Sequence, residues 1–190
     1  MPWLRPQSPE LHFHDHLSGW RGIMLRPFLL AITIVLATPA AAAGDTVFPD
    51  YGEPKAVFEF FFADPRHIDN GLYWVRSFMN PLIEAPYDMA PEFLSIVVVI
   101  HGTEIVALAR HNYEKYRDSV ERMRYYAGLG VKFRVCGLAA NDFGYDSDTF
   151  YDFVEIVPSA MVEIAHLQQQ GYGLVIPQIH NKIFATEEIR

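Results

Sequence analysis

The chain has 190 residues, of which 51% are hydrophobic and 20% are charged, and its formal net charge is −8. This length and composition fit one globular domain and argue against a largely disordered chain. The acidic balance argues against nucleic acid as a partner, because non-specific binding to nucleic acid needs a basic surface. The single cysteine, Cys136, excludes an internal disulfide and a CxxC redox site.

The N-terminal segment has the pattern of an export signal rather than of a folded domain. Met24 is the second methionine, and Arg26 supplies a short positive region after it. The apolar run FLLAITIVLA (28–37) follows, and small residues then precede Gly44. A positive start, an apolar run of about 7–15 residues and a small-residue cleavage site are the features of a secretory signal peptide.

We therefore expect a leader upstream of the true start at residues 1–23, a cleaved signal peptide at 24–43 and one domain at 44–190. The expected location is the periplasm, with no stable membrane anchor after cleavage. A retained anchor is the alternative, although the apolar run is shorter than the about 20 residues of a membrane span. Three histidines that look like a metal-binding tract would be lost with the leader: His12, His14 and His16.

The first half of the domain predicts a strand, a helix and a second strand. Residues 56–62 (AVFEFFF) are β-branched and aromatic, which is typical of a strand. Asp64 and Pro65 form a favourable start for a helix. Apolar residues then recur at helical spacing, namely Leu72, Val75, Phe78, Met79 and Leu82. Residues 95–100 (SIVVVI) form a continuous apolar run, as expected of a strand that is covered on both faces in a parallel sheet.

The second half continues the alternation of helices and strands. Residues 113–127 carry an apolar stripe opposite charged residues and predict a helix that ends at Gly128 or Gly130. The remaining predicted elements are strands at 131–136 and 153–157, a helix from the cap residue Ser159 to Gln170, and a short strand at 174–176. This alternation is typical of an α/β fold with a mainly parallel sheet of about five strands.

Two reactive side chains are expected at the carboxyl ends of strands, where open parallel sheets bind ligands. His101 directly follows the second predicted strand, and Cys136 ends the third. These two residues are the candidates for chemistry. Four residues in the loops beside them are the candidates for substrate binding: Gly102, Glu104, Gly137 and Asn141.

Cys136 is the candidate nucleophile because a thiolate can accept sulfane sulfur as a persulfide. Positive charge or a helix N-terminus favours the thiolate form. Residues 137–141 predict a short helix directly after Cys136, and Arg134 points to the same face of the strand. His101 would stabilise the thiolate or move a proton.

Each candidate also has a purely structural interpretation. Cysteine is among the most buried residue types and often acts as a small apolar filler. His101 is alternatively hydrogen-bonded to a loop, and Arg134 is alternatively a solvated edge residue. Glu104 and Asn141 are residue types common in caps and turns. The aromatic loop 143–153 is alternatively an interface.

Motifs for common cofactors are absent from the sequence. It contains no GxGxxG after a strand, no GxxxxGK[ST], no GxSxG and no HExxH. The acidic loop that includes Asp142, Asp146, Asp148 and Asp152 lacks the glycine and terminal glutamate of an EF-hand. We therefore expect no cofactor and no bound metal. A small-molecule or metal site made from His101, Glu104 and this loop is the third and weakest interpretation.

Three segments resemble the DsrE/DsrF-like family, in particular its exported single-domain branch: SIVVVIHG (95–102), GLGVKFRVCG (128–137) and VEIVPSAMVEIAHLQQQGYGLVIP (154–177). The most specific part is G-V-x-F-x-V-C-G followed by V-P-S-x-x-x-E-I-x-x-L-Q-x-x-G-Y. The resemblance covers about residues 55–177. It implies a three-layer α/β sandwich and homo-oligomeric packing. In sulfur-relay members of the family, the cysteine after the third strand carries sulfur as a persulfide, and Cys136 occupies the matching place.

The leading expectation is a periplasmic sulfur-relay-type protein that binds or transfers sulfane sulfur on Cys136. Its partners would be copies of itself and a protein that donates or accepts sulfur. The alternative is a non-enzymatic homo-oligomeric binding module in which Cys136 is a buried structural residue. Exposure of the thiol separates the two expectations, because a persulfide carrier must be reached by its donor.

Overall fold

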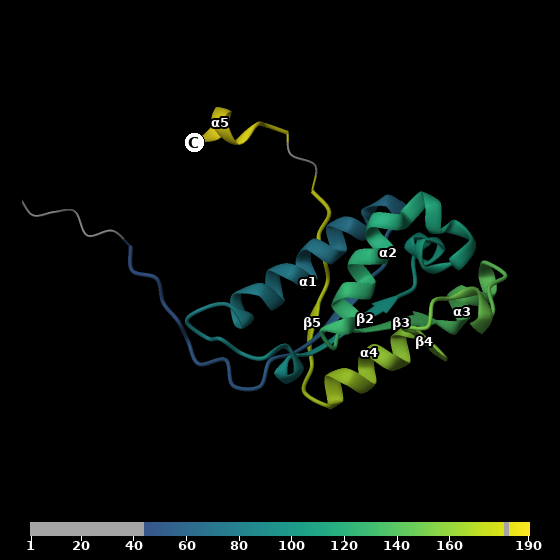
Figure 1. Ribbon diagram of the computed structural model, residues 1–190, viewed down its shortest axis with the longest axis horizontal. Helices are drawn as coiled ribbons and strands as arrows, with labels where there is room; N and C mark the ends of the chain where they lie inside the picture. The colour runs from purple at the N-terminus through teal and green to yellow at the C-terminus, as the bar shows by residue number, and fades with distance from the viewer. Residues whose placement is uncertain (1–43, 181–182) are drawn as a thin grey trace, which may run out of the picture. The chain divides into compact units, whose positions relative to one another are not determined.

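The structure is a computed structural model that describes residues 44–180 and 183–190 (Figure 1). The predicted leader and signal peptide, residues 1–43, lie outside the described residues. Thr46–Arg190 form one compact unit, and it contains all the elements below. Within the described ranges, every helix is too short or too polar to span a bilayer.

The core of the unit is a five-stranded parallel sheet. Its strands are β1 (Lys55–Phe60), β2 (Ser95–Ile100), β3 (Lys132–Cys136), β4 (Val154–Val157) and β5 (Gly173–Val175). They lie in the order β4-β3-β2-β1-β5, and each neighbouring pair is parallel. The predicted α/β fold with a parallel sheet is therefore confirmed.

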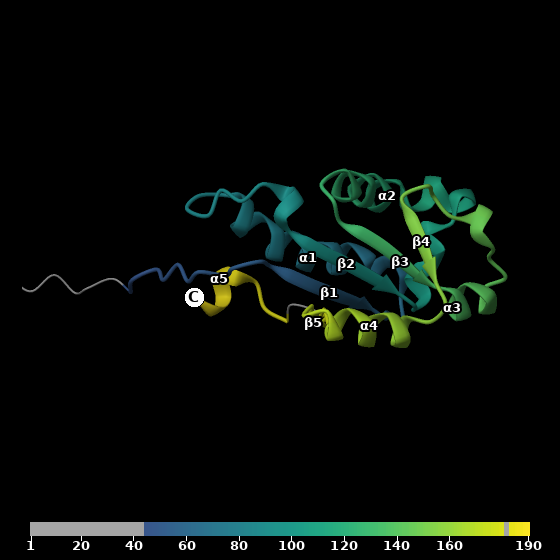
Figure 2. The ribbon, with the colours of Figure 1, turned by 90° about the horizontal axis from the view of Figure 1, so that it is seen from below.

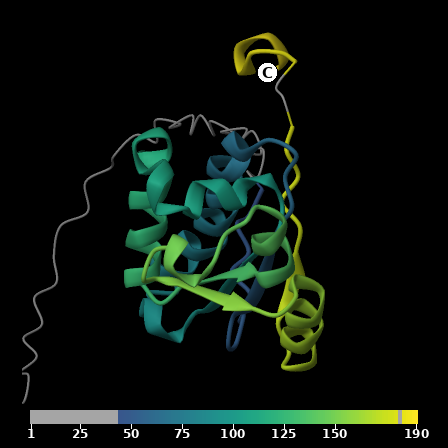
Figure 3. The same ribbon diagram turned by 90° about the vertical axis from the view of Figure 1, so that its right-hand side faces the viewer.

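Helices cover both faces of the sheet, which gives the three layers that the resemblance implied (Figures 2 and 3). The helices are α1 (Ile68–Ile83), α2 (Tyr113–Gly128), α3 (Gly137–Asp142), α4 (Ala160–Gln169) and α5 (Thr186–Ile189). Short 3₁₀ turns occur at Pro65–His67, Pro91–Phe93, Thr103–Leu108, Arg110–Asn112 and Ser147–Thr149. The helices α1 and α2 lie on one face of the sheet and α4 on the other, while α3 lies beyond the carboxyl ends of the strands (Figure 2).

The ends of the helices follow the predicted signals with two differences, at Asp64 and at Ser159. Asp64 accepts a hydrogen bond from the backbone N–H of Arg66 (2.9 Å), but the turn that it caps is a 3₁₀ turn that leads into α1. The helix α2 ends at Gly128, and Gly130 then adopts a φ of +96°, a left-handed conformation that favours glycine. Ser159 takes the N-cap position of α4 without a capping hydrogen bond from its side chain.

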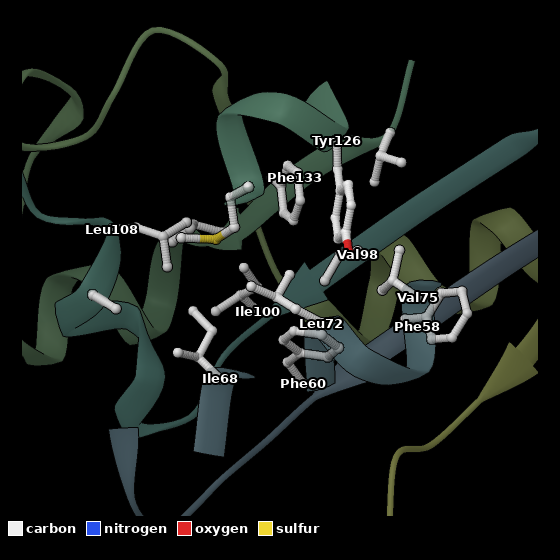
Figure 4. Packing of buried hydrophobic residues seen from close by; sticks show 14 of the residues in the cluster. Phe58, Phe60, Ile68, Leu72, Val75, Val98, Ile100, Leu108, Tyr126 and Phe133 are labelled. Carbon is white, nitrogen blue, oxygen red and sulfur yellow. The ribbon is translucent and has the colours of Figure 1, made fainter. Parts of the chain in front are cut away.

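The larger hydrophobic core lies between the sheet and the helices α1 and α2 (Figure 4). The strands contribute Phe58, Phe60, Val98, Ile100 and Phe133, which alternate along β1, β2 and β3. The predicted apolar stripe of α1 faces them and is buried at four of its five positions, the exception being the half-buried Phe78. This packing supports the strand ends on which the candidate site is built.

The smaller core lies between the sheet and α4. The other alternate residues of the strands, Val57, Val97 and Val99, pack there with residues of α4. Cys136 belongs to this smaller core. Within the described unit, the face of the sheet that carries the thiol is covered by α4, a single helix of ten residues.

Candidate functional site

Cys136 and His101 lie side by side at the carboxyl end of the sheet. The last paired residues of β2 and β3 are Ile100 and Val135, so His101 and Cys136 are next in register. Side chains alternate along a strand, and Val99 faces α4. His101 therefore points to the same face of the sheet as Cys136.

The thiol of Cys136 is buried, with 6% of the residue exposed. Cys136 is the last residue of β3 and also the N-cap residue of α3, which begins at Gly137 as the predicted short helix. It packs with Ala160, Ile164 and other residues of the smaller core. The burial agrees with the structural interpretation of Cys136, and a reagent can reach the thiol only if its cover moves.

His101 is held by two contacts from β1 and the residue that follows it. Its Nε2 atom lies 3.0 Å from Oε1 of Glu59. Its ring stacks on the ring of Phe61, with a centroid distance of 4.6 Å and an interplanar angle of 9°. Glu59 and Phe61 both point to the face of Val57, because residues two apart share a face of a strand. These two contacts orient the imidazole toward β1, while Cys136 is the register neighbour of His101 on the β3 side of β2.

Glu104 lies in the interior of the loop that follows His101. It is fully buried, and its two oxygens accept hydrogen bonds from the backbone N–H groups of Phe62 (2.9 Å) and Gly102 (3.0 Å). Burial raises the pKa of this carboxyl above its ordinary value, although the two N–H donors and His101 act in the opposite direction. Both oxygens are used within the protein, so Glu104 shapes the loop beside the site and does not present its carboxylate to a substrate.

The three other predicted binding residues differ in their surroundings. A Cβ atom on Gly102 would lie 2.5 Å from the backbone nitrogen of Phe62, and one on Gly137 would lie 3.1 Å from the carbonyl oxygen of Val157. These two glycines therefore allow backbone segments to approach each other closely. Asn141 is exposed on α3.

Arg134 does not place a free positive charge beside the thiol. It shares a face of β3 with Cys136, as predicted, and its Nε atom donates to Glu155 of β4 at 2.8 Å. Its Nη1 atom donates to Glu163 of α4. The guanidinium charge is therefore balanced by two carboxylates, and the second ion pair ties α4 to the strand that carries Cys136.

Glu59 and Phe61 were missed by reasoning from sequence. The available signal was Glu59 itself, the one charged residue within the predicted strand AVFEFFF (56–62). A charged side chain at such a position usually has a partner. The partner, His101, is 42 residues away in sequence, and only the pairing of β1 with β2 brings the two together.

The acidic and aromatic loop is largely occupied by its own contacts. Asp146 caps the turn Ser147–Thr149 and accepts hydrogen bonds from the backbone and side chain of Thr149. Arg124 of α2 lies over the rings of both Tyr151 and Phe153. Among the described residues, no group of three or more histidine, cysteine, aspartate and glutamate side chains is arranged to hold a metal ion.

Comparison with known proteins decides the family. A sequence model of the DsrE/DsrF-like family matches residues 67–177, which is more than half of the chain and includes β2, β3, His101 and Cys136. The chain belongs to the DsrE/DsrF-like family. This family is generally related to sulfur relay. A search of curated proteins found no match.

A solved structure agrees with the fold. The protein of unknown function MTH1491 from Methanobacterium thermoautotrophicum is 22% identical to this chain and superimposes with a TM-score of 0.52. The similarity covers 65% of this chain and 99% of that protein. At this level of identity the comparison supports the DsrE-like fold and not a shared activity.

Proposed function

We propose that this chain is a sulfur-relay protein that is exported to the periplasm, accepts sulfane sulfur as a persulfide on Cys136 and passes it to a partner protein. The observation that carries the proposal is the register of β2 and β3, which sets the chain's one thiol next to an imidazole at the carboxyl end of a parallel sheet. Ligands of open parallel sheets bind at that end. Membership of a family related to sulfur relay supports the same function.

The proposed reaction is an exchange of a sulfur–sulfur bond with no net oxidation or reduction. Cys136 loses its proton to His101, and the thiolate attacks the outer sulfur of a donor persulfide. A bond forms between Sγ and that sulfur while the sulfur–sulfur bond of the donor breaks. The donor leaves as a thiolate and takes the proton from His101. The products are a persulfide on Cys136 and a donor thiol.

Burial of Cys136 requires that the site opens before transfer. The residues that cover the thiol come from α4, which packs on the smaller core. We therefore propose that a donor reaches Sγ when the amino-terminal end of α4 moves, and that the persulfide is otherwise shielded from reductants.

The export part of the proposal is supported by sequence alone. Met24, Arg26 and the apolar run at 28–37 have the order of a signal peptide. Sequencing the N-terminus of the protein recovered from the periplasmic fraction tests it. A mature start near Gly44 is expected, and a chain that stays in the cytoplasm with its first residues intact would contradict export.

Mass spectrometry of the intact protein tests the sulfur chemistry. The chain is incubated with inorganic polysulfide beside the C136S variant, and excess reagent is removed. The wild type should gain the mass of one or more sulfur atoms, this gain should disappear with a reducing agent, and C136S should gain nothing. Equal masses for the two proteins would refute the proposal.

A second candidate function is favoured by the 6% exposure of Cys136. In that case the chain is a binding module and the cysteine is a packing residue. Labelling of the thiol separates the two functions. A thiol that reacts with iodoacetamide only after denaturation, in a protein that also takes up no sulfur, would leave the binding module as the better description.

A further inference from the structure

We propose that Glu59 is a positioning residue of the candidate site, which holds His101 in the tautomer that can take the proton of Cys136. The inference rests on the proposed function, because it treats Cys136 as the reacting thiol. It assigns a role to a residue outside the predicted site, that of the carboxylate that orients a base.

The contact between Glu59 and His101 is short and shielded. The distance between Oε1 and Nε2 is 3.0 Å, and the two side chains are 18% and 13% exposed. Phe61 stacks on the imidazole, so the ring has little freedom to rotate away from the carboxylate. A charge-assisted hydrogen bond in such surroundings is stronger than one at an open surface.

Arg134, which lies in register with Glu59 two strands away, has other partners. In the sheet, Glu59 pairs with Val99, and Val99 pairs with Arg134. Arg134 lies on the far side of Val99 and donates to Glu155 and Glu163. The polar contacts on this face therefore form two separate groups, one between β1 and β2 and the other among β3, β4 and α4.

The carboxylate determines which ring nitrogen carries the proton. An ionised carboxylate only accepts hydrogen bonds, so Nε2 must be the donor and must hold a hydrogen. In a neutral imidazole, Nδ1 then has the free lone pair and can accept a proton. When Nδ1 takes the proton from Cys136, the carboxylate of Glu59 also stabilises the resulting imidazolium.

The test compares E59Q and E59D with the wild type in two measurements. The first is the ¹⁵N NMR spectrum of the His101 ring, assigned with an H101N variant, because the ring nitrogen shifts report the tautomer. The second is the rate of alkylation of Cys136 by iodoacetamide, followed by mass spectrometry. The E53Q variant is the control, since Glu53 is 85% exposed and pairs with Lys55.

We expect the wild type to show the tautomer with hydrogen on Nε2, and E59Q to show a mixture of tautomers. We also expect E59Q to be alkylated about tenfold more slowly, because an oriented base assists removal of the proton. E59D keeps a carboxylate and should recover part of the rate. E53Q should match the wild type, and circular dichroism should show that each variant is folded.

An unchanged tautomer in E59Q, together with an unchanged alkylation rate, would overturn the role of Glu59. This result can be told apart from failure of the proposed function. If the wild type takes up no sulfur from polysulfide, sulfur relay on Cys136 is refuted, while the NMR and alkylation measurements still decide whether Glu59 orients His101.

Discussion

Gly102 occupies a space that a larger residue cannot enter. Its backbone lies between Phe62 and the buried carboxylate of Glu104, and the two N–H groups that Glu104 binds belong to Phe62 and Gly102. The contact joins the segment after β1 to the segment after β2, directly beside His101. Gly102 and Glu104, which were predicted to bind substrate, therefore build the loop that follows His101, the candidate for chemistry.

Replacing Gly102 with alanine should destabilise the protein by about 1–3 kcal/mol, because overfilling a packed site forces the backbone to shift. A Cβ atom there would meet Phe62 N and Glu104 Oε2 at 2.5 Å. Urea denaturation measures the change. The control is G128A at the end of α2, where a Cβ atom meets nothing within 4 Å. If G102A is as stable as G128A, the backbone around Gly102 accommodates a side chain and the close packing does not constrain this position.

Glu104 should make stability depend on pH in an unusual direction for a carboxyl group. Burial raises its pKa in the folded state above the ordinary 4.5, so the folded protein holds this proton more tightly than the unfolded chain. The resulting gain in the free energy of unfolding is fully present below pH 4.5 and is lost as pH rises through the raised pKa of Glu104. Wild-type stability should therefore fall relative to E104Q across that window. Denaturation curves of both proteins at several pH values measure this difference, and a difference independent of pH would contradict the assignment.

At the scale of elements, the proposed opening of the site depends on α4. It covers Cys136 with apolar residues, and Glu163 binds Arg134, a residue on the same strand as the cysteine. The two side chains of this pair are 13% and 19% exposed, so removing one partner should cost more than breaking an open surface pair does. The pair thus helps to hold α4 over the thiol.

Weakening this ion pair should expose the thiol. We expect E163Q to react with iodoacetamide about tenfold faster than the wild type under native conditions, which corresponds to an opening made easier by about 1.4 kcal/mol. The matched control is E155Q, which removes the other partner of Arg134 without touching α4. Equal labelling rates in E163Q and E155Q would show that α4 does not control access.

At the scale of the whole molecule, the two faces of the sheet are covered unequally. Two helices of 16 residues pack on one face, and one helix of ten residues packs on the other. On the outer side of α4, Met161 and Val162 are exposed and line a shallow groove with Ala165, His166 and Gln169. We propose that a second copy of the chain covers this surface, in keeping with the homo-oligomer that the resemblance implied.

Light scattering coupled to gel filtration tests the proposed association. The wild type should have the mass of an oligomer, and V162D should shift toward the monomer, because a charge on an apolar interface is costly to bury. F93D is the control, since Phe93 is 71% exposed in a turn that precedes β2. A monomeric wild type, or equal dissociation of V162D and F93D, would contradict this interface.

Local patterns in the sequence were sufficient to predict most of the fold. The run of residues 95–100 and the stripe on α1 are read from neighbouring residues, because burial and helical periodicity impose a repeat on the chain. A short helix directly after Cys136 was also predicted, and it corresponds to α3. The strand predicted at 56–62 is the exception, since β1 ends at Phe60. Phe62 instead donates its N–H to Glu104, a contact 42 residues away that local pattern does not contain.

The sequence by itself determined the α/β class, the family, the sole thiol and its place at the end of a strand. Only the tertiary structure decided that Cys136 is buried under α4, that Arg134 is balanced by Glu155 and Glu163, and that Glu59 holds His101. The physical reason is that a strand end is a local property of the chain, whereas burial and charge pairing depend on which distant segments are packed against it.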